Sequence, residues 1–504
     1  MTARDGILLT GATGQLGRYL LREVLAWGHS VAVLVRDEHT TAVERVRELH
    51  NDISDSLGRR LPTPTVVSGN LRAAGLGLGT ADTNWLSQHC GNVVHAAASV
   101  SFRSTADGEP WETNTEGTRR LLELCGKLGI QDFHHISTAF VCGEHPEPVF
   151  ETEHSSEQVF RNEYERSKHA AEALVREQRS IRATIYRPSV IVGDSQTGYT
   201  QTYQGIYRFL ELADRLAQSE KGVRKRMLPL RLPFTGDEQR NLVPVDWVAQ
   251  AIVRLMCQTG STGATYHLTT PNPTTVRDIT EVAIAELDLE GVVLAGSAPS
   301  DAGELERAFL DGLREYWPYL GSDPAFDCRN TQTALPRFPT PRVDRHAVRK
   351  LIRFAIRNRW GRNPRSGRAS GSIDCAHYIE QFFPDALSRS VLASVPIDAT
   401  LGFVISGSGG GRWTCKLSGG KVVVIERISS LLPDVEFRLD VQTFAAIITG
   451  KETPQVAFFR RRIEIIGNIE RGLKLAMLFN QFVREFPYDA ASRQEPRHAS
   501  TSPM

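Results

Sequence analysis

Short apolar runs alternate with amphipathic stretches through the first half of the chain. The amphipathic stretches at 116–129 and 157–179 have helical spacing. Strands that alternate with helices form right-handed βαβ units, which build a parallel sheet covered by helices on both faces. We therefore predict an α/β fold with a Rossmann-type, doubly wound parallel sheet over residues 1–275. The apolar runs taken as strands are residues 7–9, 30–36, 64–70, 92–98, 132–143 and 182–193.

The pattern becomes less regular further along the chain. Residues 241–255 and 266–270 resemble strands, and 343–360 combine an apolar helical stripe with arginines on the remaining faces. We expect residues 276–360 to form a substrate-side helical extension of the first domain. The next segment, 361–376, is rich in Ser, Gly, Pro and Arg and is predicted to be a linker.

A different pattern begins beyond the linker. Residues 400–427 alternate between apolar and polar positions around glycine turns, which predicts antiparallel strands. Helical spacing follows at 440–449 and 470–486. We therefore expect a smaller α+β domain over residues 377–487. The last residues, 488–504, are polar and are predicted to be a disordered tail.

Composition narrows the class of protein. Of 504 residues, 41% are hydrophobic and 23% charged, and the net charge of +1 argues against a nucleic-acid partner. Seven cysteines occur without a C-x-x-C pair, so we expect free thiols and no metal site. No apolar run reaches the roughly 18 residues of a membrane span, and the early first strand leaves no room for a signal peptide. We expect a cytoplasmic protein, or one peripheral to a membrane.

A glycine-rich turn follows the first predicted strand. Gly11, Gly14 and Gly17 recur at every third position and lead into a helix, so free backbone N–H groups can meet a phosphate there. Arg36 ends the second strand, where an acidic residue would bind the 2′-hydroxyl of NAD. Arginine suits a 2′-phosphate instead, and Arg45 can assist it. Asp37 opposes this preference, but the pattern favours NADP(H).

Three side chains point to proton chemistry. Tyr164 and Lys168 are four residues apart on a predicted helix and therefore share one face. A nearby ammonium group is expected to lower the pKa of the tyrosine, which is otherwise about 10. Thr138 ends a predicted strand and can direct its hydroxyl group into the same crevice.

Six motifs in order carry a family resemblance: TGATGQLG, HAAASVSF, NTEGT, ISTAFVCG, YERSK and YRPSVIVGDSQTG. They resemble the extended short-chain dehydrogenase/reductase superfamily. The resemblance implies that Tyr164 exchanges a proton with the substrate oxygen and that Lys168 lowers its pKa and holds the nicotinamide ribose. It implies that Thr138 binds the substrate oxygen and that Asn114 supports a water of a proton relay. The implied cofactor contacts are Gly11, Thr13, Gly14, Gln15, Leu16 and Gly17 at the pyrophosphate, Asn70 and Leu71 at adenine, Ala97, and Pro188 and Ser189 near the carboxamide, with Lys168 at the ribose.

Three further stretches indicate which branch of this superfamily the chain resembles. RPSVIVGDSQTGYT, PVDWVAQAI and YWPYLGSDPAFDCRNTQTAL resemble the fatty acyl-CoA reductase and thioester reductase branch. That resemblance implies NADPH-dependent reduction of a hydrophobic acyl thioester to an aldehyde or an alcohol. The arginine-rich helix could then meet a membrane, an acyl carrier protein or CoA phosphates, or be a solvated face. Two alternatives stay open: an alcohol/ketone oxidoreductase acting on a steroid, polyketide or other lipid-like molecule, and a non-catalytic lipid-binding protein.

The C-terminal domain carries a second resemblance. FVISGSGGGRWTCKLSGGKVVVIER, FRLDVQTFAAIITGKETPQVAFFRRRIEIIGN and RGLKLAMLFNQF resemble a sterol-carrier-protein (SCP-type) lipid-binding domain. The resemblance implies an apolar tunnel for acyl chains or sterols. Ordinary core packing is the alternative role for each side chain. The residues expected along such a tunnel are Leu473, Ala476, Met477, Phe479 and Phe482.

Overall fold

The N-terminal domain is built on a seven-stranded parallel sheet with the order β11-β6-β5-β4-β1-β2-β3. The chain runs outward from the central β1 to one edge and then crosses to the other side, as in a doubly wound fold, so the predicted fold class is confirmed. The strands are β1 (Gly6–Thr10), β2 (Val31–Val35), β3 (Thr65–Ser68), β4 (Cys90–His95), β5 (Asp132–Ile136), β6 (Arg182–Pro188) and β11 (Thr265–Leu268). The computed structural model describes residues 4–37, 41–145, 148–152, 158–217, 226–258, 260–361, 374–407, 409–427, 432–459 and 462–488.

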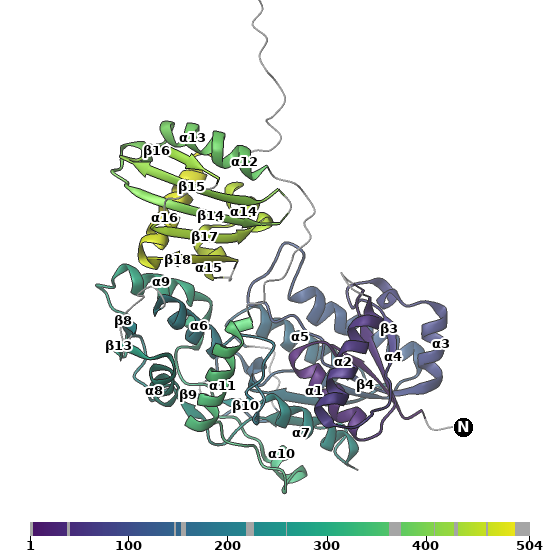
Figure 1. Ribbon diagram of the computed structural model, residues 1–504. Helices are drawn as coiled ribbons and strands as arrows, with labels where there is room; N and C mark the ends of the chain where they lie inside the picture. Colours follow the sequence, from purple (N-terminus) through teal and green to yellow (C-terminus); the bar gives the residue numbers. More distant parts are fainter. Residues whose placement is uncertain are drawn as a thin grey trace, which may run out of the picture.

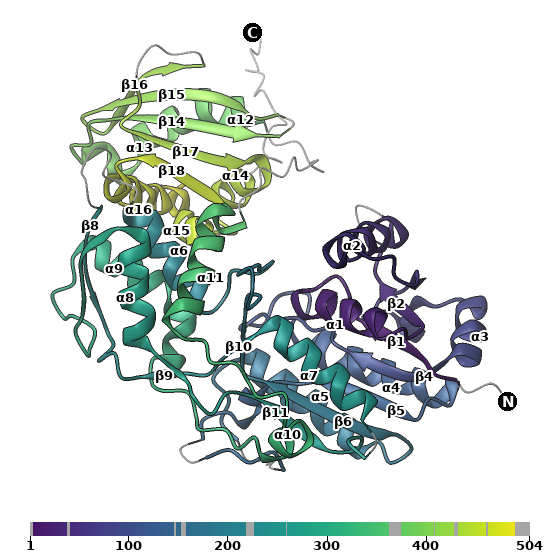
Figure 2. The same cartoon turned by 60° about the horizontal axis from the view of Figure 1, so that its bottom comes forward.

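Helices cover both faces of this sheet (Figure 1; Figure 2). Two separate apolar clusters lie between the helices and the sheet, one on each face, which explains the apolar runs of the strands. One face carries α1 (Gln15–Ala26), α2 (Ala42–Leu57) and α7 (Val245–Cys257). The other face carries α3 (Thr80–His89), α4 (Gly117–Leu128) and α5 (Glu163–Glu177).

The strand expected over 241–255 is wrong for most of its length. Only Leu242–Pro244 is extended, as β10, and α7 follows at once. Pro244 occupies the N-cap of α7, where its fixed φ and missing N–H cost little. Nearly all of α7 is buried, so its sequence lacks the polar face that distinguishes an amphipathic helix from a buried strand.

A second lobe lies beside the carboxyl end of the sheet. Its helix α11 (Arg345–Arg357) packs against α8 (Val276–Leu287) through the predicted apolar stripe. Three of its arginines face acids of α8: Arg345 pairs with Asp278 and Glu281, and Arg349 and Arg353 share Glu286. These guanidinium groups therefore bind the chain itself. Other elements of the lobe are β7 (Val190–Val192), α6 (Ile206–Ala217), β8 (Arg226–Leu232), β9 (Gln239–Arg240), β12 (Thr274–Thr275), β13 (Leu289–Leu294), α9 (Glu304–Gly312), the 3₁₀ turn η4 (Arg314–Tyr319) and α10 (Arg329–Ala334).

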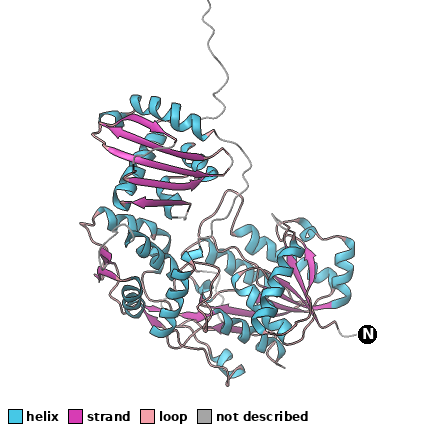
Figure 3. Cartoon of the chain, in the orientation of Figure 1, coloured by secondary structure: helices cyan, strands magenta, loops and turns pink. Residues whose placement is uncertain are grey.

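The C-terminal domain is a five-stranded mixed sheet with the order β16-β15-β14-β17-β18, flanked by helices (Figure 3). The predicted antiparallel strands are present, but β14 also pairs in parallel with β17. The elements are α12 (Cys375–His377), α13 (Phe383–Arg389), β14 (Ala399–Ser406), β15 (Gly411–Ser418), β16 (Lys421–Glu426), β17 (Val435–Asp440), α14 (Val441–Ile448), α15 (Pro454–Phe459), β18 (Ile463–Gly467) and α16 (Ile469–Glu485). Most of the predicted linker, 362–373, and most of the predicted tail, 489–504, lie outside the described residues.

An apolar cavity of about 80 Å³ lies inside the C-terminal domain. Ala476, Phe479 and Phe482 line it as expected, and Leu473 is buried in the core without lining it. Met477 is 62% exposed, so its assignment to the tunnel was wrong. One helical step of about 100° carries position 477 away from the face that Ala476 buries. The cavity therefore follows one face of α16.

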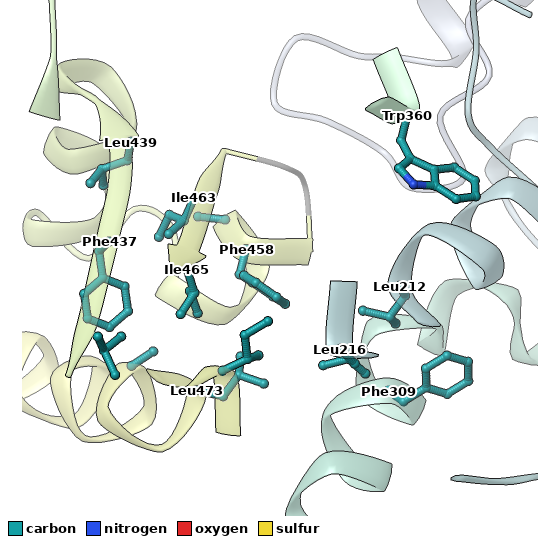
Figure 4. Close-up of a cluster of buried hydrophobic side chains, with 14 of the residues drawn as sticks. Leu212, Leu216, Phe309, Trp360, Phe437, Leu439, Phe458, Ile463, Ile465 and Leu473 are labelled. Carbon is teal, nitrogen blue, oxygen red and sulfur yellow. The ribbon is translucent and has the colours of Figure 1, made fainter. Parts of the chain in front are cut away.

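The C-terminal domain is seated on α6 and α9 of the lobe (Figure 2; Figure 4). Arg215 of α6 is buried, and its guanidinium group donates to the carbonyl oxygens of Phe458 at 2.7 Å and Ile463 at 2.9 Å. The same group lies 3.8 Å from the centre of the Phe458 ring. These two carbonyls belong to α15 and β18, so one side chain of the lobe binds two elements of the second domain. Of the helices described, none is long and apolar enough to cross a membrane.

Candidate active site

The predicted cofactor residues gather along one edge of the large sheet. Parallel neighbours end at the same edge, and each of six strands there is followed by a predicted site residue. β1 leads into the glycine turn, β2 into Arg36 and β3 into Asn70 and Leu71. β4 leads to Ala97, β5 to Thr138, and β6 to Pro188 and Ser189.

The glycine turn leaves no space for side chains. Gly11 has a φ of +75°, and a Cβ atom there would lie 2.6 Å from the backbone nitrogen of Ala97. A Cβ atom on Gly17 would lie 1.9 Å from the carbonyl oxygen of Gly11. Gly14 is the N-cap of α1 and supplies no side-chain cap, so the first N–H groups of that helix stay available for an anion. This cradle fits a pyrophosphate.

Substitution of Gly17 by alanine is expected to disrupt this cradle. The added methyl group meets backbone atoms that cannot rotate away, so we expect a loss of about 1–3 kcal/mol in stability and weaker binding of the dinucleotide. Gly126→Ala is the matched control, because no atom lies within 4 Å of its Cβ position and it is a helical site, where alanine stabilises by roughly 0.5–1 kcal/mol. Thermal unfolding and fluorescence titration with NADPH measure both effects. Equal behaviour of the two variants would contradict the tight packing of the turn.

Basic groups lie beside the glycine turn. Arg45 of α2 donates to the carbonyl oxygen of Arg36 at 3.0 Å and to the hydroxyl group of Thr13 at 3.3 Å. Asp37 accepts hydrogen bonds from the hydroxyl group of Ser68 and from the N–H of Ala42, and these bonds, that of Ser68 first, lower its pKa. The carboxylate that could have bound a ribose hydroxyl is therefore already engaged by α2 and β3.

Tyr164 and Lys168 lie on α5, beside Thr138. Burial, followed by the charge of Glu165, raises the pKa of Tyr164 to about 12, while a hydrogen bond with Thr138 acts in the opposite direction. Lys168 is buried, donates to the carbonyl oxygen of Ile136 at 2.7 Å, and has its pKa lowered to about 8 by burial. The tyrosine pKa is therefore raised rather than lowered in this structure, because burial and Glu165 outweigh the opposing influences.

Asn114 is placed by a π-turn (Glu112–Glu116) that precedes α4, a feature that often marks functional sites. Its amide nitrogen donates to the carbonyl oxygen of Ser99 and to the hydroxyl group of Ser167, both at 2.9 Å. Its amide oxygen accepts from the N–H of Ser99 at 2.7 Å. The side chain thus ties α4 to α5 and to the segment after β4, beside Tyr164.

An open cleft of about 720 Å³ adjoins the start of α5. Phe102 lines it, and the Phe102 ring centre lies 6.5 Å from that of Tyr164. Four arginines and two glutamates lie along the cleft. Three of the arginines form ion pairs: Arg103 with Glu315 at 3.0 Å, Arg166 with Glu163 at 2.5 Å, and Arg161 with the buried Glu165 at 3.4 Å. The cleft therefore keeps only a small excess of positive charge. The charged residues are Arg103, Arg161, Arg166, Arg314, Glu163 and Glu315.

Comparisons with known proteins agree with this geometry. Residues 9–252 match the family described as male sterility protein, and residues 388–480 match the SCP-2 sterol transfer family. Residues 9–252 thus match an extended short-chain dehydrogenase/reductase domain, and residues 388–480 match an SCP-type domain. The chain is 25% identical over 397 residues to aldehyde reductase lnaA of Aspergillus flavus, covering 69% of the chain and 36% of that relative. It is 32% identical over 283 residues to isonitrile lipopeptide synthase of Streptomyces coeruleorubidus, covering 53% and 18%. The chain therefore spans about a third or less of these relatives.

Solved reductase domains share the fold of the reductase. The terminal R domain from the myxalamid PKS-NRPS biosynthetic pathway is 27% identical with a TM-score of 0.58, covering 71% of this chain and 91% of that one. The R domain of a nonribosomal peptide synthetase from Mycobacterium tuberculosis has a TM-score of 0.54 at 19% identity, covering 70% and 91%, and shows the fold alone. The N-terminal part of the chain is thus similar to solved R domains and shares their fold.

A buried ion pair behind α5 was not predicted from the sequence. Glu172 of α5 and Arg187 of β6 are both buried and pair at 2.6 Å. Burial alone would raise the pKa of Glu172, but Arg187 and Arg176 hold it well below its usual range. Ser137 also donates to Glu172, at 2.7 Å. The pair holds α5, and hence Tyr164, against the sheet; two charged residues 15 positions apart offered no pattern that would have revealed it.

Proposed function

We propose that this protein is an NADPH-dependent reductase of a hydrophobic acyl thioester, carried by CoA or by an acyl carrier protein. The cleft beside Tyr164 is the observation that carries the proposal, because its arginines outnumber its glutamates and Arg314 stands outside the ion pairs of the other three. Thiol carriers bring phosphate groups, which guanidinium groups bind well. Similarity to a solved R domain at 27% identity supports the same reaction class. A ketone or sterol brings no phosphate and would make no use of this charge.

Each of three side chains has a separate task in the proposed reaction. The hydroxyl group of Thr138 holds the carbonyl oxygen of the thioester, and Tyr164 gives that oxygen a proton. Lys168 holds the nicotinamide ribose in place of the carbonyl group of Ile136, which it binds in this structure. NADPH, when bound, supplies a hydride to the carbonyl carbon. Loss of the thiol from the resulting hemithioacetal leaves an aldehyde, and a second reduction would give the alcohol.

Proton donation at neutral pH agrees with the state of Tyr164. Its pKa of about 12 keeps the phenol protonated, as a donor must be. Asn114 lies beside α5 and is proposed to keep this part of the site aligned, because both ends of its amide group are bound by the chain itself.

The cofactor preference is proposed to be NADP(H) rather than NAD(H). Arg36 and Arg45 lie where β2 ends, and the bonds of Asp37 to Ser68 and Ala42 occupy the competing carboxylate. The remaining contacts are proposed from their places at the edge of the sheet. They are Thr13 to Gly17 at the pyrophosphate, Asn70 and Leu71 at adenine, Ala97 beside the turn, and Pro188 and Ser189 at the carboxamide.

Replacement of Arg36 by alanine is expected to weaken the binding of NADPH but not that of NADH. A charge-assisted bond to a 2′-phosphate contributes about 1.5–3 kcal/mol, so the Kd for NADPH should rise roughly 10- to 100-fold while that for NADH changes little. Arg47→Ala is the control, because Arg47 is exposed on α2, the helix that carries Arg45, at a position turned away from the glycine turn. Isothermal titration of each variant with both cofactors measures the effect. A parallel loss for NADH would contradict 2′-phosphate binding.

The SCP-type domain is proposed to bind the apolar part of the substrate or product. Its cavity of about 80 Å³ is lined by apolar side chains from the sheet and from α16. Engineered cavities of about 150 Å³ accept benzene, so a long acyl chain requires this cavity to open. Attachment to the reductase through Arg215 keeps such a ligand near the cleft, which raises its local concentration.

The test is a coupled assay on the full chain. NADPH and a long-chain acyl-CoA are added, and loss of the reduced nicotinamide absorbance is followed together with the release of free thiol. A carrier-bound acyl thioester and a panel of hydrophobic ketones and alcohols are run in parallel. Equal amounts of oxidised NADPH and released thiol are expected if the product is the aldehyde, and a ratio of about two if it is the alcohol. Turnover of ketones without thiol release would overturn the proposal.

A further inference from the structure

One wall of the cleft is formed by a segment far from Tyr164 in the sequence. The turn η4 contributes Arg314, Glu315 and Pro318 to the lining, and the opposite wall consists of residues 160–163 with Arg166 and Phe102. The two walls belong to different lobes, because η4 follows α9 whereas the opposite wall leads into α5. The width of the cleft therefore depends on whatever holds η4 against α5.

Tyr319 makes the buried part of that connection, and an exposed ion pair between Arg103 and Glu315 at 3.0 Å adds to it. The hydroxyl group of Tyr319, the last residue of η4, donates to Glu165 at 2.6 Å across 154 residues of sequence. Asn162 donates to the same hydroxyl oxygen at 2.5 Å. Glu165 is fully buried, directly follows Tyr164, and also accepts from the N–H of Arg161 at 3.0 Å. These bonds join η4 to the first turn of the helix that carries Tyr164.

Aromatic rings continue the connection toward Tyr164. The Phe102 ring centre lies 5.7 Å from that of Tyr319, 5.4 Å from that of Tyr316 and 6.5 Å from that of Tyr164. Rings at these separations are in packing contact, so a displacement of η4 also moves Phe102. Phe102 itself lines the cleft, and both the wall and the surroundings of Tyr164 thus depend on the position of Tyr319.

Joining η4 to α5 through the carboxylate of Glu165 has an energetic cost. Burial of the carboxylate costs free energy that an apolar contact would avoid, and desolvation raises the pKa of Glu165 accordingly. The guanidinium group of Arg161, 3.4 Å away, and the bound N–H and O–H groups offset this cost. The hydrogen bond between Tyr319 and Glu165 fixes the direction and the distance between the two lobes, whereas an apolar contact does not.

We propose that Glu165 is a positioning residue that holds η4 through Tyr319 and thereby sets how closely the cleft fits the acyl thioester. The inference rests on the proposed function, since it assigns the cleft to the thioester. Glu165 makes no contact with the reacting atoms or the glycine turn, although its charge contributes to the raised pKa of the neighbouring Tyr164. Its loss should therefore weaken substrate binding more than it slows the chemical step, and should leave cofactor binding unchanged.

Tyr319→Phe is the first test, because it removes one hydroxyl group and keeps the ring. We expect the KM for a long-chain acyl-CoA to rise five- to twentyfold, with kcat within threefold and the Kd for NADPH within twofold of the parent values. Tyr266→Phe is the control, because Tyr266 lies on β11, away from the cleft. Its hydroxyl group donates to the carbonyl oxygen of Ser261 at 2.8 Å. No change in KM is expected for this variant.

Two replacements of Glu165 separate a positioning role from general support of the fold. Glu165→Gln keeps an oxygen acceptor for Tyr319 and should hold KM within threefold, whereas Glu165→Leu should reproduce the rise seen with Tyr319→Phe. An unchanged KM in Tyr319→Phe, or a fall in kcat at constant KM, would overturn the inference. A parent protein that neither reduces nor binds acyl thioesters would overturn the proposed function and this inference with it, and the parent protein alone reveals that result.

Discussion

Tyr164→Phe should abolish reduction and leave binding intact. The phenol is the proposed proton donor, and loss of a general acid costs roughly 10²- to 10⁴-fold in rate. We expect kcat/KM for the acyl thioester to fall by at least a hundredfold. The Kd for NADPH should stay within twofold, because no cofactor contact is assigned to the hydroxyl group. Steady-state kinetics and fluorescence titration measure the two quantities.

A second buried tyrosine provides the control. Tyr378 lies in the SCP-type domain, and its hydroxyl group has no hydrogen-bond partner within the part of the chain that the structure describes. Tyr378→Phe removes the same atom from a buried phenol far from the sheet edge and should leave turnover unchanged. If Tyr164→Phe retains more than a tenth of the parent activity, the assigned role is wrong. Lost lipid binding alongside lost turnover would indicate a general folding defect instead.

Arg187→Met should destabilise the nucleotide-binding domain by about 3–5 kcal/mol, because it leaves the carboxylate of Glu172 buried without its main partner. Midpoints of thermal unfolding should fall by roughly 10 °C. The pKa of Glu172, held low in the parent, rises once Arg187 is gone. The deficit should therefore be largest at neutral pH and shrink as the pH falls, because the carboxyl group of the variant takes up a proton at a higher pH than that of the parent.

A neighbouring pair on the same strand tests whether burial is the cause. Arg182 also lies on β6 and pairs with Asp132 at 2.7 Å, but its side chain is 64% exposed. Arg182→Met makes the same chemical change at an exposed ion pair, whose contribution is about 1 kcal/mol or less. Equal unfolding midpoints for the two variants would show that the Glu172 pair does not hold α5 in place.

Local patterns in the sequence predicted most of the first domain. The strand-like runs, the glycine turn and the four-residue spacing of Tyr164 and Lys168 depend on neighbours within a few positions. Such patterns can be read wherever one face of an element is polar or a turn residue marks its end. The order of the elements then predicts the doubly wound sheet, since βαβ connections are right-handed. The ends of parallel strands meet at one edge, which is why the site residues could be named together.

Tertiary contacts decided the rest, because each of these properties depends on partners distant in sequence. Most of residues 241–255 form a helix that is buried on nearly all sides, so the sequence lacks the polar positions that would have indicated a helix. Arg349 forms an ion pair with Glu286 of α8 rather than facing solvent or an anionic partner. Lys168 binds the end of β5, and burial raises the pKa of Tyr164 rather than lowering it. The bond from Tyr319 to Glu165 spans 154 residues, a distance over which neither period nor spacing carries information.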